Sequence, residues 1–417
     1  MQQRGSNLPR VGDYNQVLVV DLVRRHPGIS RVELTERTGL SGQTVSNICR
    51  RLVDQGLIRQ TGRVSTELGA RRTVFEVVPG SRCAVGLHID PARMTLALVD
   101  LAGQVMDHTS FVTPDTGGPA PVIDAIVGQV RDLVDRNGVS GLRLSGLGVA
   151  SPGPISRGSG AVLGPPNLRG WDVVGLRDEL GGRLRIPVEL EKDTVAAATG
   201  ELWAGNLLSQ DFAFVYLGTG AGAGVVLGGE VMHGASGNLG NFGHLGGDPD
   251  GPRCECGGRG CVATTAMPAH LVRQALESGL LADIDVEDAS SVEQGLAKLS
   301  VLAADGNTAA AGILDRAARS FARVVANLTN VLDLDTIVFG GPNWRYLSES
   351  FLRIVPGVVD ELHLFRRLHG VEIRGTSLGE DVGPIGAASL VLAKSVSASA
   401  SHLILPAGPP SLSSPPA

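Results

Sequence analysis

Apolar residues recur every three or four positions in three short segments near the N-terminus, a pattern typical of amphipathic helices. The first segment, Tyr14–His26, is stopped by a Pro-Gly pair. The second, Ser30–Gly39, opens with a Ser-x-x-Glu capping box and closes at a glycine. The third begins at Ser41, which we expect to cap it. The pattern therefore predicts three helices separated by tight turns.

The third helix carries both an apolar and a polar stripe. Its apolar stripe consists of Val45, Ile48, Cys49 and Leu52. Its polar stripe consists of Gln43, Ser46, Asn47 and Arg50, with Thr44 beside it. Amide, hydroxyl and guanidinium groups can read base edges in the major groove of DNA. A solvated surface face is the alternative, but two capped helices joined by a tight turn favour a helix-turn-helix.

Two strand-like pieces follow this helix, Leu57–Arg59 and Thr73–Val77. The loop between them contains Arg63, Arg71 and Arg72, which suit the DNA backbone or the minor groove. Residues 1–80 are therefore predicted to form a winged helix-turn-helix domain that binds DNA.

Strands and helices alternate from Cys83 onward, which predicts an α/β fold over residues 81–393. Expected strands and helices are 83–89, 94–99, 104–112, 121–136 (helix), 142–149, 188–191, 193–204 (helix), 212–217, 336–339, 371–375 and 383–393 (helix). The pattern of three strands, a helix and further strands occurs twice, so we expect a duplicated fold with a cleft between two lobes. Residues 394–417 are rich in Ser, Ala and Pro, and we expect a disordered tail.

Composition narrows the class of protein. The chain has 417 residues, 43% of them apolar, without an apolar run of membrane-spanning length or a signal-peptide pattern at the start. We expect a cytoplasmic protein with reduced thiols. Residues 1–80 carry a net charge of +5 and the remainder −11. A basic head on an acidic body is expected when only the head meets a polyanion.

The segment from Gly240 to Cys261 contains three of the five cysteines and one histidine, with many glycines between them. The four candidate ligands are His244, Cys254, Cys256 and Cys261. Zn²⁺ prefers four nitrogen or sulfur ligands in a tetrahedron, so this set predicts a closed, structural zinc site. A disulfide with bystander residues is the alternative, and the reducing setting disfavours it.

Five motifs of the body resemble the ROK family, which comprises repressors, open reading frames and kinases. They are Pro166–Trp171, Glu191–Glu201, Leu217–Val226, Gly240–His244 and Gly251–Cys261. The resemblance spans about residues 81–393, and residues 1–80 resemble the winged head of the family's transcription factors. It implies two actin-like, ribonuclease-H-like lobes. The implied contacts to a sugar effector are Asn167, Asp193, Asn241 and His244.

The resemblance also shows where this chain departs from the family's kinases. His88 occupies the position of the acid that orients Mg²⁺ in those kinases. Asp90-Pro91-Ala92 occupies the position of the Gly-Gly-Thr of their phosphate loop. Lys192, Asn241 and Ala263 replace three groups that bind the sugar. Asp193 holds the position of the family's general base, although a helix N-cap would also explain it. We therefore expect no catalytic residues and no enzyme activity.

The run Gly218–Gly224 has two interpretations, a loop that binds phosphate or a tight turn between hairpin strands. Because the first loop has lost its glycines, the hairpin turn is favoured.

These patterns predict a transcriptional regulator, in particular a repressor of carbohydrate-related genes. Its expected partners are double-stranded DNA with an inverted-repeat operator, a sugar or sugar-phosphate effector, and further copies of itself in a homodimer or homotetramer. The alternatives are an active ATP-dependent sugar kinase and a DNA-binding protein without an effector.

Overall fold

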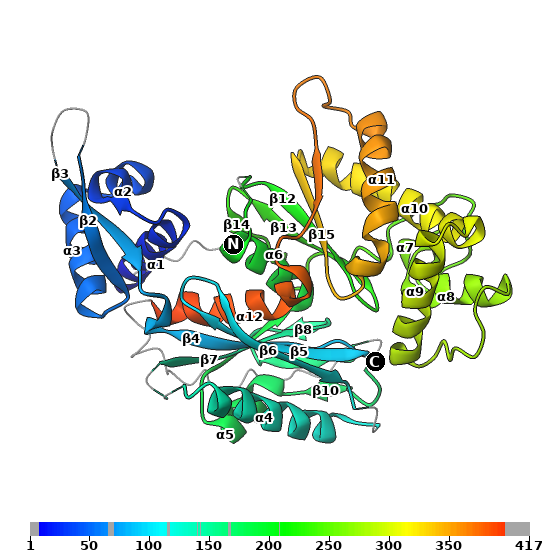
Figure 1. Cartoon of the computed structure of the whole chain (residues 1–417), viewed down its shortest axis with the longest axis horizontal. Coiled ribbons are helices and arrows are strands. Elements are labelled where there is room, and N and C mark those ends of the chain that lie inside the picture. The colour runs from blue at the N-terminus through cyan, green and yellow to red at the C-terminus, as the bar shows by residue number, and fades with distance from the viewer. Residues whose placement is uncertain are drawn as a thin grey trace, which may run out of the picture. The chain divides into compact units, whose positions relative to one another are not determined.

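The computed structural model describes residues 8–65, 71–114, 117–139, 141, 143–165, 168–207 and 209–396, in two compact units (Figure 1). The first unit is Met1–Ser81 with Leu392–Ala417, and the second is Arg82–Val391. None of the described helices is both long and apolar enough to cross a membrane.

The first unit has three helices and a small antiparallel sheet in the order β1-β3-β2. Its elements are α1 (Leu8–Arg25), β1 (Ile29–Ser30), α2 (Arg31–Thr38), α3 (Gly42–Asp54), β2 (Ile58–Ser65) and β3 (Arg71–Val77). The predicted helices are confirmed, but α1 begins at Leu8 and not at Tyr14, because its first turn lacks the apolar pairs used to place its start. The second strand-like piece of the wing is confirmed as β3.

The first lobe of the second unit is a five-stranded sheet in the order β11-β7-β4-β5-β6. Its strands are β4 (Cys83–His88), β5 (Arg93–Asp100), β6 (Val105–Val112), β7 (Leu144–Ser151) and β11 (Val188–Lys192). Helices α4 (Pro119–Arg136) and α5 (Leu176–Leu184) supply apolar side chains to its core. A small sheet of β8 (Ile155–Ser156), β9 (Ala161–Leu163) and β10 (Val173–Val174) completes this lobe.

The second lobe repeats the design in the order β14-β13-β12-β15-β16. Its strands are β12 (Phe212–Leu217), β13 (Ala221–Leu227), β14 (Glu230–Val231), β15 (Thr336–Gly340) and β16 (Glu372–Gly375). Its other helices are α7 (Val262–Thr265), α8 (Pro268–Glu277), α9 (Ala289–Ala304), α10 (Thr308–Leu332) and α11 (Trp344–Leu362). In both lobes three antiparallel strands are followed by two parallel ones, so the predicted duplication is confirmed.

Helices α6 (Asp193–Ala204) and α12 (Val382–Ser395) pack closely against each other and against the first sheet (Figure 1). A Cβ at Gly86 would lie 1.8 Å from the carbonyl oxygen of Pro384, and one at Gly386 would lie 1.7 Å from that of Ala196. Only glycine permits such backbone approach. Helix α12 continues to Ser395, two residues beyond Ala393, so the predicted start of the tail at residue 394 is wrong. Residues 397–417, which hold the rest of the predicted tail, lie outside the described part of the chain.

Candidate functional site

The first unit presents α3 as a capped helix with one buried face. Ser30 and Glu33 form the predicted capping box of α2, and α2 ends at Gly39 with a positive φ of 68°. The Ser41 hydroxyl then accepts a hydrogen bond from the Thr44 backbone N–H at 3.2 Å. The four apolar residues of the predicted stripe in α3, Cys49 among them, are buried. Both turns are thus set by short-range contacts that fix the angle between α2 and α3.

The opposite face of α3 is polar and open to solvent. Gln43, Asn47 and Arg50 are exposed, and they are joined through the Asn47 side-chain oxygen, which accepts from the Gln43 amide at 3.1 Å and from the Arg50 guanidinium at 3.5 Å. Ser46 is half-buried on the same helix. Thr44 is also half-buried, and its hydroxyl lies 2.9 Å from that of Ser41. Gln43, Asn47 and Arg50 can therefore reach a ligand without local rearrangement.

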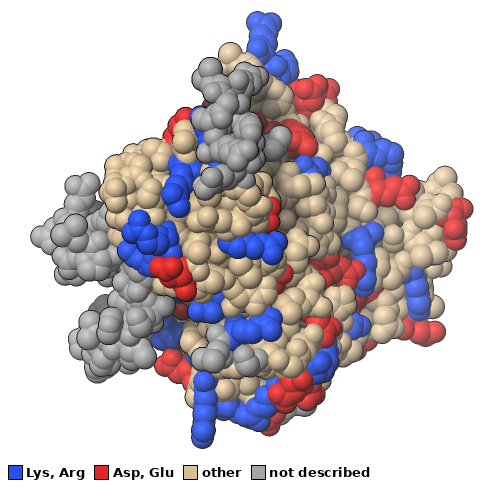
Figure 2. All heavy atoms as spheres, turned by 60° about the vertical axis from the view of Figure 1, so that its left-hand side comes forward, with Lys and Arg blue, Asp and Glu red and all other residues tan. Residues whose placement is uncertain are grey.

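The wing is the β2–β3 hairpin. Its strands pair from Ile58 with Val77 to Ser65 with Arg71, with an irregularity between Gln60 and Gly62. Arg72 is exposed on β3. The side chains of Arg63 and Arg71 lie outside the described residues. On the face seen in Figure 2, Lys and Arg lie in several separate groups among Asp and Glu.

Helix α3 is also tied to the end of the chain within the same unit. The buried Gln16 side chain of α1 donates to the Val396 carbonyl oxygen at 2.7 Å, and its own oxygen accepts from Arg51 of α3 at 3.1 Å. Val396 directly follows α12, whose first residues lie in the second unit, where Gly383 approaches the His88 ring. One continuous helix therefore links the surroundings of His88 to the support of α3.

The predicted metal ligands come together in the second unit. The ligand atoms of His244, Cys254, Cys256 and Cys261 all lie within 4.8 Å of one another. His244 Nδ1 is 3.4 Å from the Cys254 sulfur, and the sulfurs of Cys256 and Cys261 are 3.6 Å apart. A tetrahedral zinc site has ligand–ligand edges of about 3.5–3.8 Å, given its metal–ligand bond lengths. The donor set therefore fits a metal ion, and each cysteine in it is free of a disulfide.

A cleft of about 600 Å³ lies beside this cluster. Its lining includes three of the predicted sugar contacts, Asp193, Asn241 and His244, whereas Asn167 lies outside the described residues. Burial raises the pKa of Asp193 to about 6, and nearby Lys192 opposes that rise. The structure brings these three residues together around one cavity.

The beginning of α6 corrects one interpretation of Asp193. Lys192, not Asp193, occupies the N-cap position, and Asp193 is the first residue of the helix. The Asp193 carboxylate accepts from the Thr194 backbone N–H at 2.7 Å. The Lys192 ammonium donates to the carbonyl oxygens of Asn238 and Leu239 at 3.3 and 3.0 Å, and burial lowers the pKa of Lys192. Asp193 is therefore not the N-cap residue, although its carboxylate accepts from one N–H of the first turn, and it also lines the cleft.

Asp90 lies at the end of the cleft where the resemblance places the phosphate loops. Its carboxylate accepts from the Ala92 backbone N–H at 2.9 Å and from the Thr219 hydroxyl at 3.3 Å, with the Thr219 N–H at 3.5 Å. A Cβ at Gly218 would lie 3.1 Å from the same carboxylate. The turn at Thr219 joins β12 to β13, so the predicted hairpin turn is confirmed. The Asp90 carboxylate thus already accepts from the Thr219 N–H and hydroxyl of this turn.

His88 and Tyr216 form a buried pair beneath Asp90. The Tyr216 hydroxyl lies 2.6 Å from His88 Nε2. Burial lowers the pKa of His88 to about 4 and raises that of Tyr216 well above its usual value. Both rings are therefore neutral near pH 7, so the residue at the position of the metal-orienting acid carries no charge here.

Sequence reasoning missed some of the polar contacts around the cleft. Glu191 is almost completely buried, and its carboxylate lies 3.1 Å from Arg157 and 3.3 Å from His233. The contact between Asp90 and Thr219 joins residues from different lobes. The signal available for Glu191 was its charge inside a strand that was expected to be buried. Its two partners, Arg157 and His233, could not be identified from their positions in the sequence.

Comparison with known proteins covers both units. The sequence profile of the ROK family matches residues 84–394, and that of the MarR family matches residues 7–66. A glucokinase of Thermotoga maritima is 31% identical over 74% of this chain and 96% of its own length. A xylose repressor of Caldicellulosiruptor bescii is 22% identical over 92% of this chain and 96% of its own length.

Among solved structures, a ROK family transcriptional regulator described as a homologue of the Escherichia coli MLC protein has the same fold. It superposes with a TM-score of 0.73, at 21% identity, over 92% of this chain and 97% of the other.

Proposed function

Since the chain belongs to the ROK family, we propose that it is a DNA-binding transcriptional repressor of carbohydrate-related genes whose second unit senses a sugar. The observation that carries this proposal is the fusion of a winged helix unit, which matches the MarR family, to the ROK body. The xylose repressor relative aligns over 92% of the chain and therefore over both parts. A repressor of this kind would act in the cytoplasm, where its DNA lies.

In this proposal α3 reads bases in the major groove. Gln43, Asn47 and Arg50 supply donors and acceptors suited to adenine and guanine edges. Thr44 and Ser46 lie on the same helix, and Arg63, Arg71 and Arg72 of the wing would hold phosphates or enter the minor groove. A homodimer or homotetramer would place pairs of α3 on the two halves of an inverted repeat, about one helical turn or a multiple of it apart.

The second unit would bind its effector without phosphorylating it. Asp193, Asn241 and His244 line the cleft, and Asn167 is the fourth proposed contact. The Asp90 carboxylate beside Thr219 would repel nucleotide phosphates, and Pro91 has no backbone N–H to offer them. Asp193 keeps the position of a general base, yet a base alone transfers no phosphoryl group.

We further propose that the cluster binds Zn²⁺ as a structural ion. His244, Cys254, Cys256 and Cys261 supply four ligands, so a bound ion has no open position for a substrate. Such an ion would cross-link the loop and would not act as a Lewis acid in catalysis. It would fix the position of His244, which also lines the cleft.

Sensing requires that the effector prefer one conformation over another. The cleft is lined by both lobes, and α12 leads from the neighbourhood of His88 to the Gln16 contact that supports α3. A ligand that favours one arrangement of the lobes would thus change how α3 is held. DNA affinity would change with it.

The test is fluorescence anisotropy of the full-length protein on a labelled duplex from upstream of its own gene, with a shuffled duplex of equal length as competitor. We expect sequence-preferring binding that falls in Arg50→Gln but not in Arg319→Gln, an exposed arginine of α10. Equal affinity for both duplexes would contradict the proposal. A coupled ADP assay with a hexose panel tests the kinase alternative, and release of ADP would support it.

The same anisotropy assay tests the alternative without an effector. Sugars and sugar phosphates are added one at a time to the protein–DNA complex, and thermal shift is measured in parallel. A ligand that raises the melting temperature and changes DNA affinity supports sensing. DNA binding that none of the ligands changes would support the body as an oligomerisation module alone.

A further inference from the structure

The second unit contains a second cavity that adjoins the cleft. It has a volume of about 610 Å³ and extends from the metal cluster toward α8. Five residues, among them His244, Glu255 and Ala263, line both the cleft and this second cavity, so the two spaces adjoin there. Because the side chain of Ala263 is a single methyl group, it leaves room at the junction. A ligand longer than one sugar ring can therefore span both spaces.

The second cavity is rich in basic side chains. Arg253 comes from the loop of the metal cluster, and His270 and Arg273 come from α8. Both arginines are exposed, and within the part of the chain that the structure describes, neither is paired with a carboxylate. His270 is half-buried, and burial and the charge of Arg273 lower its pKa, so it is a neutral donor near pH 7. Two arginines without acidic partners suit a carboxylate or a phosphate.

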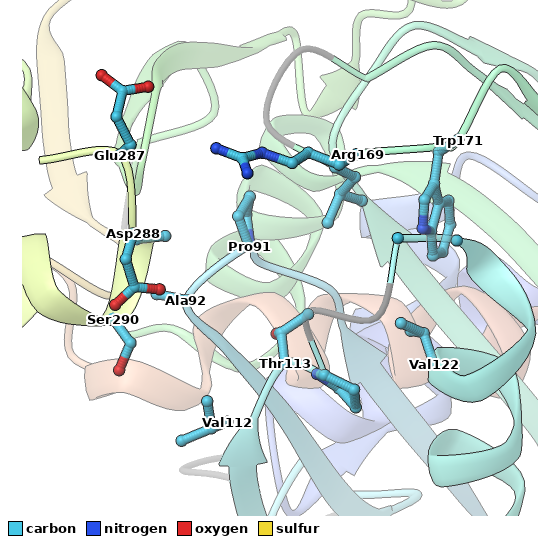
Figure 3. A pocket seen from close by; sticks show the side chains of 15 residues that line it. Pro91, Ala92, Val112, Thr113, Val122, Arg169, Trp171, Glu287, Asp288 and Ser290 are labelled. Atoms are coloured by element: carbon cyan, nitrogen blue, oxygen red, sulfur yellow. The ribbon is translucent and has the colours of Figure 1, made fainter. Parts of the chain in front are cut away.

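Two acidic residues, Glu255 and Glu287, also line the second cavity, as does a third arginine, Arg169. Figure 3 shows the Arg169 side chain extending from the first lobe toward the segment before α9 that carries Glu287 and Asp288. The Asp288 carboxylate accepts a hydrogen bond from the Ser291 backbone N–H at 2.7 Å, at the start of α9. Glu255 lies at the junction, where its carboxylate can accept hydrogen bonds from sugar hydroxyls. The lining of the second cavity thus carries three arginines against two glutamates, a net positive charge.

Asp193 lines the cleft but not the second cavity. A sugar ring that places a hydroxyl on Asp193 would direct its opposite end past His244 toward the arginines. Close to Asp193 and Asp90 an anionic substituent would meet two carboxylates, whereas in the second cavity it would meet guanidinium groups. The charge distribution thus orients a ligand that carries charge at one end.

We propose that the effector is an extended sugar with an anionic end, whose ring occupies the cleft and whose carboxylate or phosphate binds Arg253 and Arg273. This inference rests on the proposed sugar-sensing function and names the chemical class that the site selects. It assigns the second cavity as a specificity subsite.

The test is isothermal titration calorimetry of the full-length protein with matched neutral and charged probes. Cellobiose is compared with cellobionic acid, and glucose with glucose 1-phosphate, so the two pairs separate carboxylate from phosphate. Inorganic phosphate is titrated alone. Arg253→Gln and Arg273→Gln are compared with Arg319→Gln, which makes the same chemical change on an exposed face of α10. The metal content of each variant is measured, because Arg253 adjoins Cys254.

We expect the charged member of at least one pair to bind about tenfold or more tightly than its neutral partner. That preference is lost in Arg273→Gln and Arg253→Gln and kept in Arg319→Gln. Equal binding within both pairs, absence of binding by both charged sugars, or a preference that survives both variants would overturn the inference. If the wild-type protein still binds its upstream DNA specifically, the proposed function stands. Loss of specific DNA binding in the wild-type protein would contradict that function instead.

Discussion

Replacing Asp90 with asparagine should stabilise the protein near neutral pH. Asp90 is 4% exposed, and burial raises the pKa of its carboxyl to about 6 despite hydrogen bonds from Ala92 and Thr219. Asparagine keeps the acceptor for the Ala92 N–H but carries no charge. Because the charged form is what burial penalises, removing the charge removes the penalty.

The magnitude follows from linkage. The folded pKa lies above the usual 3.8, so the folded state holds the proton more tightly than the unfolded state. The free-energy cost of burying the charged Asp90 is therefore absent at pH values below the pKa of the unfolded state. It is complete at pH values above the pKa of the folded state. It amounts to about 3 kcal/mol near pH 7.5 and about 1.6 kcal/mol near pH 5. The long contact to the Thr219 N–H is lost, which costs about 0.5–1 kcal/mol. The expected net gain is about 2 kcal/mol near pH 7.5 and about 1 kcal/mol near pH 5.

The assay is urea unfolding of wild type and Asp90→Asn at both pH values. Asp360→Asn, an exposed carboxylate on α11, is the matched control and should change little at either pH. Asp193 also titrates near 6, and loss of the Asp90 charge lowers its pKa, which adds to the gain at the higher pH. A variant no more stable than wild type near pH 7.5, or a gain that grows as pH falls, would refute the reasoning.

Three further predictions concern the other parts of the molecule. Arg50→Ala should weaken specific DNA binding by about 1–3 kcal/mol in anisotropy titrations, with the larger loss on the upstream duplex than on a shuffled one. Cys254→Ser, or chelation of the wild type, should release bound zinc and lower stability by on the order of 4 kcal/mol, measured by metal analysis and urea unfolding; an unchanged metal content would contradict the assigned ligand set. Gln16→Leu should leave effector binding intact but reduce its effect on DNA affinity by about threefold or more, because the contacts to Val396 and Arg51 are lost, and an unchanged effect would exclude this link.

The sequence by itself determined the features that depend on neighbours within a few positions. Three such features are the capping box at Ser30, the left-handed glycine at position 39 and the buried stripe of α3. In each, neighbouring members are at most four positions apart along the chain. The cluster around Cys254–Cys261 was predictable for the same reason, since its spacing confines the sulfurs to a small volume. The lobes could be named only through the family's motifs, because alternation of strands and helices fits several α/β folds.

Only the tertiary structure decided which distant groups meet in the cleft. Asp90 reaches Thr219 across 129 positions of sequence, and the Gln16 side chain contacts Val396 across 380. Whether residues so far apart in sequence come into contact depends on how the two sheets and the helices α6 and α12 pack. Gly386 permits that packing through a close backbone approach, which no local pattern encodes. The helix start at Leu8 and the N-cap at Lys192 likewise differ from what the local patterns predict.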